Sequence, residues 1–569
     1  MIAHISSALS GHGAFFIQGL VVIAVLAVGW YWPALGDSIL RPVEEKGARL
    51  ARRKTVVIVG MAAGTIVIRL SMLWLTPVPV PVAHDELSYL LAGDTLAHGR
   101  LTNPTHPMWI FLDTIHVNQQ PVYMSKYPPG QGAALAFGQI LGHPWIGVLL
   151  SMAAMGAAVV WMLQGWFPPV WAMLGGLLAL LRFDLFNYWI DSYWGGAVAA
   201  IGGALVMGAL PRIMHHGRRR DALLLGLGAA ILANSRPVEG LLFCLPVGAV
   251  LGVWLFQHRD RWPAKLTNFI FPFSIVMLFT VGFIGYYNWR GTGSPFLFPY
   301  VVYQRAHFSS PPLLWQKADT SRHFVNPQFE AYSQEQLAEF ESRREHFART
   351  CWLRTSNFLG FYCGPMLAAL VLTFRRLLRD RRMRLLLIQL LLSFLGLLAV
   401  APFFLHYAAP LTATVFAVII QGMRHLRKWR SAGRPVGIGL TRAIVLLALA
   451  AIPAHVAKTI VEARHGIGWS DPKMLERGRL AAQLEAAPGK HLVLVSNSST
   501  HSPHEEWVYN AADIDDSKIV WAREIPGVDV KPLLEYFRGR TVWLLEPDRV
   551  PIQFTPYQPG PEMRPSPGP

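Results

Sequence analysis

The sequence is poor in cysteine and in charge. It has three cysteines, and 15% of its 569 residues are charged. Three cysteines cannot build the disulfide framework of a small secreted protein. Cys244 lies in an apolar run, whereas Cys351 and Cys363 are near enough in sequence to pair on an oxidising side or to remain free. The two halves also show no internal repeat, which argues against the common transporter architectures.

Long apolar runs are abundant instead. Hydrophobic residues make up 53% of the chain. They fall in continuous blocks of about 20 residues, which favour membrane-spanning helices over an alternating barrel pattern. The net charge of +17 would suggest nucleic acid as a partner of a soluble protein. Here most clustered Lys and Arg occupy short loops between blocks, so the composition predicts an all-α polytopic membrane protein and no nucleic-acid partner.

The apolar blocks predict about twelve transmembrane helices. Five loops rich in Lys and Arg then fall on one side, which the positive-inside rule identifies as the cytoplasm. The first block has no basic region before it and no clear cleavage site, so we expect an uncleaved span. The predicted spans cover residues 14–34, 55–77, 131–164, 170–182, 192–211, 222–234, 238–256, 266–288, 356–374, 385–405, 409–423 and 437–457.

The prediction divides the chain into four parts. These are an N-terminal span with a basic loop (1–54), a transmembrane domain (55–457), a small extracytoplasmic α/β domain (458–550) and a Pro-rich tail that we expect to be disordered (551–569). The transmembrane domain has large extracytoplasmic loops at 78–130 and 289–355. In the α/β domain, strands at 491–496, 518–522 and 541–546 alternate with helices near 503–511 and 531–538.

Two adjacent carboxylates, Asp85 and Glu86, follow the second predicted span. At headgroup depth a carboxylate can take a proton from an acceptor hydroxyl. On a helix the two side chains would point about 100° apart, so we do not expect them to contact the same atom. Asp85 is the candidate base, or alternatively the N-cap of the next helix. Glu86 could make a supporting or metal contact, or be solvated; Asp191 could bind sugar or a cation, or be an ordinary interfacial charge.

These residues resemble the glycosyltransferase C (GT-C) superfamily over roughly residues 55–260. The resemblance is to its bacterial branch, with protein O-mannosyltransferases, lipid A aminoarabinose transferases and rhizobial lipopolysaccharide galacturonosyltransferases. It is carried by Asp85-Glu86 with Tyr89, Ala92 and Gly99, by Lys126-Tyr127-Pro128-Pro129-Gly130-Gln131, by Asp191 before Ser-Tyr-Trp-Gly-Gly, and more loosely by Ala233-Asn234-Ser235-Arg236-Pro237.

The resemblance implies an enzyme that moves a sugar from a polyprenyl phosphate to an acceptor hydroxyl on the extracytoplasmic face, with inversion at the anomeric carbon. A carboxylate base and cations that hold the leaving phosphate would suffice. The implied catalytic residues are Asp85, Glu86 and Asp191. The implied substrate-binding residues are Tyr89, Lys126, Tyr127, Arg236, Arg290, Arg305 and His406. The arginines could instead extend along the membrane boundary.

Four histidines of the first large loop, His84, His98, His106 and His116, lie near the acidic pair. With those acids they could hold zinc or manganese, although their spacing matches no compact ligand motif. A Mg, Mn or Zn ion is therefore an open alternative, with His84 and His106 as its candidate ligands. The run His504-Glu505-Glu506 in the terminal domain reads as a solvated face.

The sequence leaves three functions open. The first is a glycosyltransferase of the bacterial cytoplasmic (inner) membrane, whose partners are a polyprenyl-phosphate sugar, membrane lipids and an unknown acceptor, and whose active site and C-terminal domain are extracytoplasmic. The second is a transporter or flippase of lipid-linked sugars, which is disfavoured because few ionisable residues lie inside the spans. The third is a non-catalytic envelope-assembly protein with the same fold.

Overall fold

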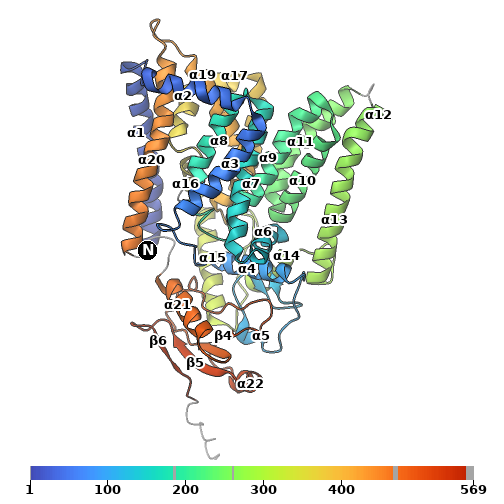
Figure 1. Ribbon diagram of the computed structural model, residues 1–569. Coiled ribbons are helices and arrows are strands. Elements are labelled where there is room, and N and C mark those ends of the chain that lie inside the picture. The colour runs from blue at the N-terminus through green and yellow to red at the C-terminus, as the bar shows by residue number, and fades with distance from the viewer. Residues whose placement is uncertain (1, 184–186, 259–261, 466–471, 559–569) are drawn as a thin grey trace, which may run out of the picture.

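The computed structural model describes residues 2–183, 187–258, 262–465 and 472–558. Most helices stand side by side in a bundle, and a small sheet lies beyond one end (Figure 1). The helices are α1 (Ile2–Tyr31), α2 (Asp37–Ala51), α3 (Lys54–Ser71), α4 (His84–Ala97), α5 (Trp109–Leu112), α6 (Pro129–Ile140), α7 (Pro144–Trp166), α8 (Pro169–Phe183), α9 (Ala197–His216), α10 (Arg219–Ser235), α11 (Pro237–Gln257), α12 (Trp262–Lys265), α13 (Phe271–Thr292), α14 (Pro299–His307), α15 (Pro327–Glu345), α16 (Phe347–Tyr362), α17 (Leu367–Arg379), α18 (Arg384–Ala399), α19 (Thr412–Arg427), α20 (Val436–His465), α21 (Pro472–Ala486) and α22 (Lys531–Tyr536). The chain also has a short π-helix, η2 (Leu266–Ile270), and three 3-10 helices among the described residues, η3 (Gly364–Met366), η4 (Arg381–Met383) and η5 (Leu405–Leu411).

Among the described residues, eight helices are long and apolar enough to cross a membrane, or nine if α16 and α17, which meet at 105°, form one broken span. The predicted count of about twelve is higher because the apolar part of α1, α8 and the 17-residue α10 fall short of the 18 residues that this criterion requires. Every predicted span still overlaps a helix of the bundle. The protein is a mostly helical, multi-pass membrane protein, as predicted.

The single span predicted over residues 131–164 is wrong. The helix is interrupted between α6 and α7, where Gly142 has φ 118° and Pro144 begins the second helix. His143 Nδ1 accepts a hydrogen bond from the backbone N–H of Trp145 at 3.2 Å and so caps α7. A left-handed glycine before a proline stops a helix, and α7 alone, with 23 residues, meets the length of a span.

The two ends of the bundle differ in what they carry (Figure 1). Helices α2, α12, α17 and α19, which bear or border predicted basic loops, reach the end farthest from the sheet. Helices α4, α14 and α15, from the two large predicted loops, gather with α6 at the end nearest the sheet. The loops predicted to share one side of the membrane therefore lie at one end of the molecule.

The C-terminal sheet has strand order β4-β3-β5-β6. Strands β3 (His491–Val495), β4 (Ile519–Arg523) and β5 (Thr541–Glu546) are parallel and match the three predicted strands, and α22 matches a predicted helix. The helix predicted near 503–511 is wrong, because that segment is an irregular loop. β6 (Gln553–Pro556) pairs antiparallel with β5 inside the predicted disordered tail, so that prediction is wrong for these residues, while 559–569 lie outside the described residues.

The first large loop packs directly on this sheet. It contains α4, α5 and the short antiparallel pair β1 (Val117–Asn118) and β2 (Met124–Ser125). One apolar cluster joins Phe111, Val117 and Tyr123 of this loop to Leu492 and Val520 of the sheet. Such shared burial fixes the domain against the membrane-surface loops. All three cysteines are free, so Cys351 and Cys363 do not pair in this structure.

Candidate active site

A cavity of about 690 Å³ lies where the bundle meets the two large loops. Its walls come from the start of α4, the β2–α6 junction, the α10–α11 turn, α14, α15, the segment before η5 and a loop of the C-terminal domain. Its ionisable and aromatic lining residues are His84, Asp85, His116, Lys126, Tyr127, Trp194, Arg236, Glu239, Tyr300, Phe308, Tyr332, Glu339, Phe340, Arg343, Phe403, Phe404, Tyr407 and His504. Predicted site residues from three separate motifs therefore meet in one cavity.

Asp85 lies in the first turn of α4 and lines this cavity. The Tyr127 hydroxyl donates a hydrogen bond to Asp85 Oδ1, and His116 Nε2 lies 3.8 Å from Asp85 Oδ2. The phenol thus orients the carboxylate, and the imidazole lies beside it. Such a group is placed to accept a proton from a ligand in the cavity.

Glu86 points in a different direction. Its Oε2 accepts the backbone N–H groups of Val82 at 2.8 Å and Ala83 at 3.0 Å, and its Oε1 accepts that of Tyr193 at 2.9 Å. Burial raises the pKa of Glu86 to about 7, although these hydrogen bonds oppose the shift. Glu86 therefore accepts hydrogen bonds from backbone N–H groups at the start of α4, where Ala83 is the N-cap residue. The alternative N-cap role for Asp85 is wrong. Glu86 is not among the residues that line the cavity.

Lys126 is buried in an aromatic cage beside Asp85. Burial lowers its pKa to about 7, and the Asp85 charge opposes part of this shift. Lys126 therefore gains or loses its proton near neutral pH, and an anion in the cavity would favour the charged form. Its Nζ lies between 4.8 and 5.3 Å from the ring centres of Tyr127, Tyr300, Tyr303 and Phe308.

His116 connects Lys126 to Asp85. Its Nδ1 lies 2.8 Å from Lys126 Nζ, so this nitrogen accepts and we assign the ring proton to Nε2. Nε2 faces Asp85 and the Tyr332 hydroxyl, which is 3.4 Å away. Burial, followed by the charge of Lys126, lowers the pKa of His116 well below its usual value. The sequence placed His116 among candidate metal ligands and gave no signal for this bridging position.

The backbone of His116 is held in the left-handed region at φ 71°. Its carbonyl accepts a hydrogen bond from Ser88 at 2.6 Å, and its N–H donates to the Tyr303 hydroxyl at 2.7 Å. A non-glycine residue rarely adopts this conformation, and such residues cluster at functional sites.

The other predicted binding residues on this side differ in their access to the cavity. Arg236, at the turn between α10 and α11, lines the cavity with its guanidinium 4.3 Å from the ring centre of Tyr407. Tyr89 stacks on Tyr127 at 4.4 Å between ring centres and supports it from behind. His406 is buried, with its Nδ1 3.1 Å from the Tyr188 hydroxyl, and is not among the lining residues.

Asp191 lies apart from the cavity, in an ion pair with Arg69 of α3 at 2.8 Å. Burial raises the pKa of Asp191, and the Arg69 charge opposes the shift. Asp191 thus ties the start of α9 to α3. Arg290 and Arg305 are exposed and do not line the cavity. The structure therefore brings Asp85, Tyr127, Lys126 and Arg236 together and leaves Asp191, Arg290 and Arg305 elsewhere.

The four candidate metal-binding histidines do not all come together: His84 and His116 share the cavity with ring centres 5.9 Å apart, whereas His98 and His106 do not line it. His84 lines the cavity, and burial lowers its pKa to about 3. His106 contacts Asp515 of the C-terminal domain at 3.1 Å, and His98 stays beside Asp94. A group whose ligand atoms lie close enough to hold an ion is found elsewhere among the described residues, at His501, Glu505 and Asp548. It includes none of the predicted ligands.

Tyr332 and His504 line the cavity although no sequence motif marks them, and the solvated face predicted for His504-Glu505-Glu506 is wrong, because His504 lines the cavity and Glu506 is buried. Tyr332 comes from α15 in the second large loop, and His504 from an irregular loop of the C-terminal domain. Their rings lie 5.6 Å apart, and His504 lies 6.1 Å from the ring of His84. They reach the cavity through tertiary packing, which a local pattern cannot indicate.

No model of a known protein family and no curated protein matches the sequence. Among solved structures, ArnT from Cupriavidus metallidurans bound to undecaprenyl phosphate is similar with a TM-score of 0.50 and 11% identity, over 86% of this chain and 92% of that chain. The apo form of the same ArnT gives a TM-score of 0.48 and 12% identity, over 85% of this chain and 93% of that chain. The first likeness shows that this chain has an ArnT-like fold.

Proposed function

We propose that the protein is a membrane glycosyltransferase that moves a sugar from a polyprenyl phosphate to an acceptor hydroxyl. The observation that carries this proposal is the meeting of Asp85, Lys126 and Arg236 in one cavity at the loop end of the bundle. A carboxylate beside two cations suits a reaction in which a hydroxyl loses a proton and a phosphate leaves. ArnT, which was crystallised with undecaprenyl phosphate, has the same fold.

In the proposed reaction the phosphate of the donor lies against Lys126 and Arg236. Asp85 accepts the proton of the acceptor hydroxyl while that oxygen attacks the anomeric carbon. The bond from this carbon to the phosphate oxygen breaks, and its electron pair leaves with the phosphate. Attack from the face opposite the leaving group inverts the anomeric carbon. Lys126 and Arg236 balance the charge that develops on the phosphate.

Tyr127 and His116 would position Asp85 in this scheme. Tyr127 donates a hydrogen bond to the carboxylate, and His116 Nε2 lies 3.8 Å from it, so both favour an orientation facing the cavity. His116 would then lie between Lys126, the cation that binds the phosphate, and Asp85, the base, because its Nδ1 accepts a hydrogen bond from Lys126. We place Glu86 and Asp191 in supporting roles, because their carboxylates are engaged by backbone N–H groups and by Arg69.

The location follows from the same proposal. We place the cavity and the C-terminal domain on the extracytoplasmic side of a bacterial cytoplasmic membrane, because the basic helices lie at the opposite end. A transporter would need a pathway through the bundle, whereas this cavity lies where the bundle meets its surface loops.

The test is transfer from a panel of radiolabelled polyprenyl-phosphate sugars in membranes depleted of endogenous donor. We expect wild type to transfer or hydrolyse one donor. Asp85→Asn should lower the rate about 10²- to 10⁴-fold while the protein stays folded, since a general base contributes that much. Equal rates in both proteins would remove Asp85 from the base role. No turnover of any donor by folded wild type would contradict the proposed function.

A further inference from the structure

One loop of the C-terminal domain reaches the candidate active site. It runs from Asn497 to Glu505, and its His504 lines the cavity. His504 is half-exposed, and its Nε2 lies 3.0 Å from Glu335 of α15. The ring centre of His504 lies 6.1 Å from that of His84, and both residues line the same cavity as Asp85.

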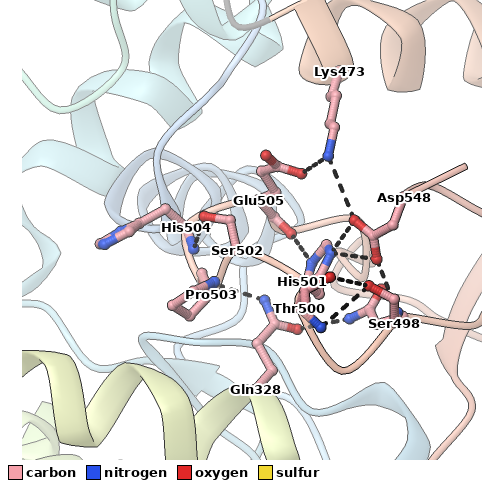
Figure 2. Close-up of polar contacts among 11 residues, drawn as sticks. Gln328, Lys473, Ser498, Thr500, His501, Ser502, Pro503, His504, Glu505 and Asp548 are labelled. Carbon is pink, nitrogen blue, oxygen red and sulfur yellow. Dashed lines mark hydrogen bonds and ion pairs between the residues drawn. The ribbon is translucent and has the colours of Figure 1, made fainter. Parts of the chain in front are cut away.

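The base of this loop is held by a cluster that we call the clamp: Lys473, His501, Glu505 and Asp548. Figure 2 shows these side chains turned toward one another while His504 points away from them. His501 Nδ1 lies 2.9 and 3.1 Å from the two oxygens of Asp548, and its Nε2 lies 2.9 Å from the Glu505 carbonyl. Each ring nitrogen faces an oxygen, so His501 makes both bonds as an imidazolium.

The charges of the clamp balance without a metal ion. Lys473 Nζ lies 2.6 Å from Glu505 and 3.4 Å from Asp548, so two cations face two carboxylates. A metal ion would need a free lone pair on His501 and would meet the Lys473 ammonium. The geometry therefore favours a structural clamp over a metal site, although the ligand atoms are close enough together for an ion.

Further bonds join the loop to the rest of the molecule. Asp548 Oδ2 accepts the backbone N–H of Ser498 at 2.9 Å. Gln328, at the start of α15, donates to the Pro503 carbonyl and accepts from Asn497, both at 3.3 Å (Figure 2). The loop is thus fixed on one side to the sheet and on the other to the helix that supplies Tyr332 to the cavity.

We propose that residues 497–505 form the wall of an acceptor subsite, and that the clamp positions His504 to bind a neutral, hydroxyl-rich acceptor such as a sugar ring. This inference rests on the proposed function and assigns a role to the C-terminal domain within it. Imidazole, phenol and amide groups from His504, Tyr332 and Gln336 suit hydroxyls and ring faces.

The charge of this wall supports a neutral acceptor. Arg343 is paired with Glu339 at 2.5 Å, so its charge is already engaged, and His504 lies beside the Glu335 carboxylate. The cations Lys126 and Arg236 belong to the part of the cavity formed by the β2–α6 junction and the α10–α11 turn. A phosphorylated acceptor would meet carboxylates rather than available cations at the His504 wall.

The test compares two fates of the donor sugar in membranes that retain the natural acceptors: transfer to a glycan or lipid, and release by water. Asp548→Asn loosens the clamp, His504→Ala removes the wall contact, and Asp516→Asn is a matched control because Asp516 is 88% exposed in the same domain. We expect the first two variants to lower transfer about 5- to 10-fold, as loss of one or two hydrogen bonds would, and to leave hydrolysis unchanged. The control should match wild type in both reactions.

Each outcome bears on the inference separately from the proposed function. The inference is overturned if both variants transfer sugar at the wild-type rate, or if transfer and hydrolysis fall equally in folded protein. It is also overturned if the clamp holds a metal ion, that is, if transfer by protein with an intact clamp needs added zinc or is abolished by EDTA while the Asp548→Asn variant is unaffected. Once unreacted donor and released sugar are separated, transferred label in the lipid-soluble or the water-soluble fraction distinguishes a glycolipid headgroup from a free glycan. Label on a phosphorylated acceptor overturns the neutral class. If wild type neither transfers nor hydrolyses, it is the proposed function that fails.

Discussion

At the end of the bundle opposite the sheet, Glu44 of α2 lies between two arginines. Its oxygens are 2.7 Å from Arg427 and 3.0 Å from Arg442, and Arg442 also pairs with Asp37 at 2.9 Å. At the cavity end, Lys126 is enclosed by aromatic rings, and its ammonium contacts the Nδ1 atom of His116. Both ends contain buried or partly buried charged groups, but Glu44 is paired with side chains of opposite charge, whereas Lys126 is surrounded by aromatic rings.

The difference appears in the direction of the pKa shifts. Burial alone would raise the pKa of Glu44, but the two arginines lower it overall, so the fold stabilises its charged form. Burial lowers the pKa of Lys126 to about 7, so the fold disfavours its charged form. A charged group that pairs with opposite charges of the protein contributes to stability. A buried charged group without such a pair indicates a site where a ligand of opposite charge binds.

Removing the Lys126 charge is the largest change that this comparison predicts. Lys126→Met keeps an apolar chain of similar length in the aromatic cage. We expect donor affinity to fall about 10- to 100-fold, because a charge-assisted hydrogen bond to phosphate contributes about 1.5–3 kcal/mol. Binding of a polyprenyl-phosphate sugar to purified protein would measure it. Lys317→Met, at an exposed position of the second large loop, is the matched control, and an equal effect there would contradict a specific phosphate contact.

The pH dependence of donor binding should follow Lys126. A phosphodiester keeps its negative charge across neutral pH, so the titrating partner is the lysine with a pKa of about 7. Below that pH Lys126 is charged and binding is strongest; above it, affinity should fall by up to about tenfold per pH unit until the lysine contribution is lost. Lys126→Arg stays charged and should give a flat profile. A flat profile in wild type would show that Lys126 is already charged without ligand.

Much of the architecture follows from the sequence because its determinants are local. Continuous apolar blocks predict the helices of the bundle, and short buried runs predict β3, β4 and β5. The interruption at Gly142 was missed because the apolar pattern continues across it. β6 was missed because its partner β5, rather than its own composition, stabilises it.

The motif residues Asp85 and Lys126 line the same cavity. Their catalytic and binding roles stay predictions. The roles of Glu86 and Asp191 depend on partners distant in sequence, namely the Tyr193 N–H and Arg69, which no spacing rule reveals. His504 and His84 are neighbours in the cavity but are 420 residues apart in the sequence (504 − 84), so only the folded chain brings them together.

The smallest expected effect lies at the opposite end of the bundle. Glu44→Gln keeps the shape of the side chain and removes the charge between Arg427 and Arg442. We expect donor transfer to stay at the wild-type rate and the free energy of unfolding to fall by about 1 kcal/mol, because these side chains are partly exposed and screened. Thermal unfolding of the solubilised protein would measure this difference.

The effect of Glu44→Gln on the free energy of unfolding should also depend on pH. Since the pKa of Glu44 is lowered on folding, its stabilisation is present above the ordinary carboxyl range and is lost as pH falls through the lowered value. The stability difference between wild type and Glu44→Gln should therefore vanish in acid, whereas donor affinity, governed by Lys126, changes above neutral pH. A loss of transfer in folded Glu44→Gln would show instead that the two ends of the bundle are coupled, and the separation of stability from binding would fail.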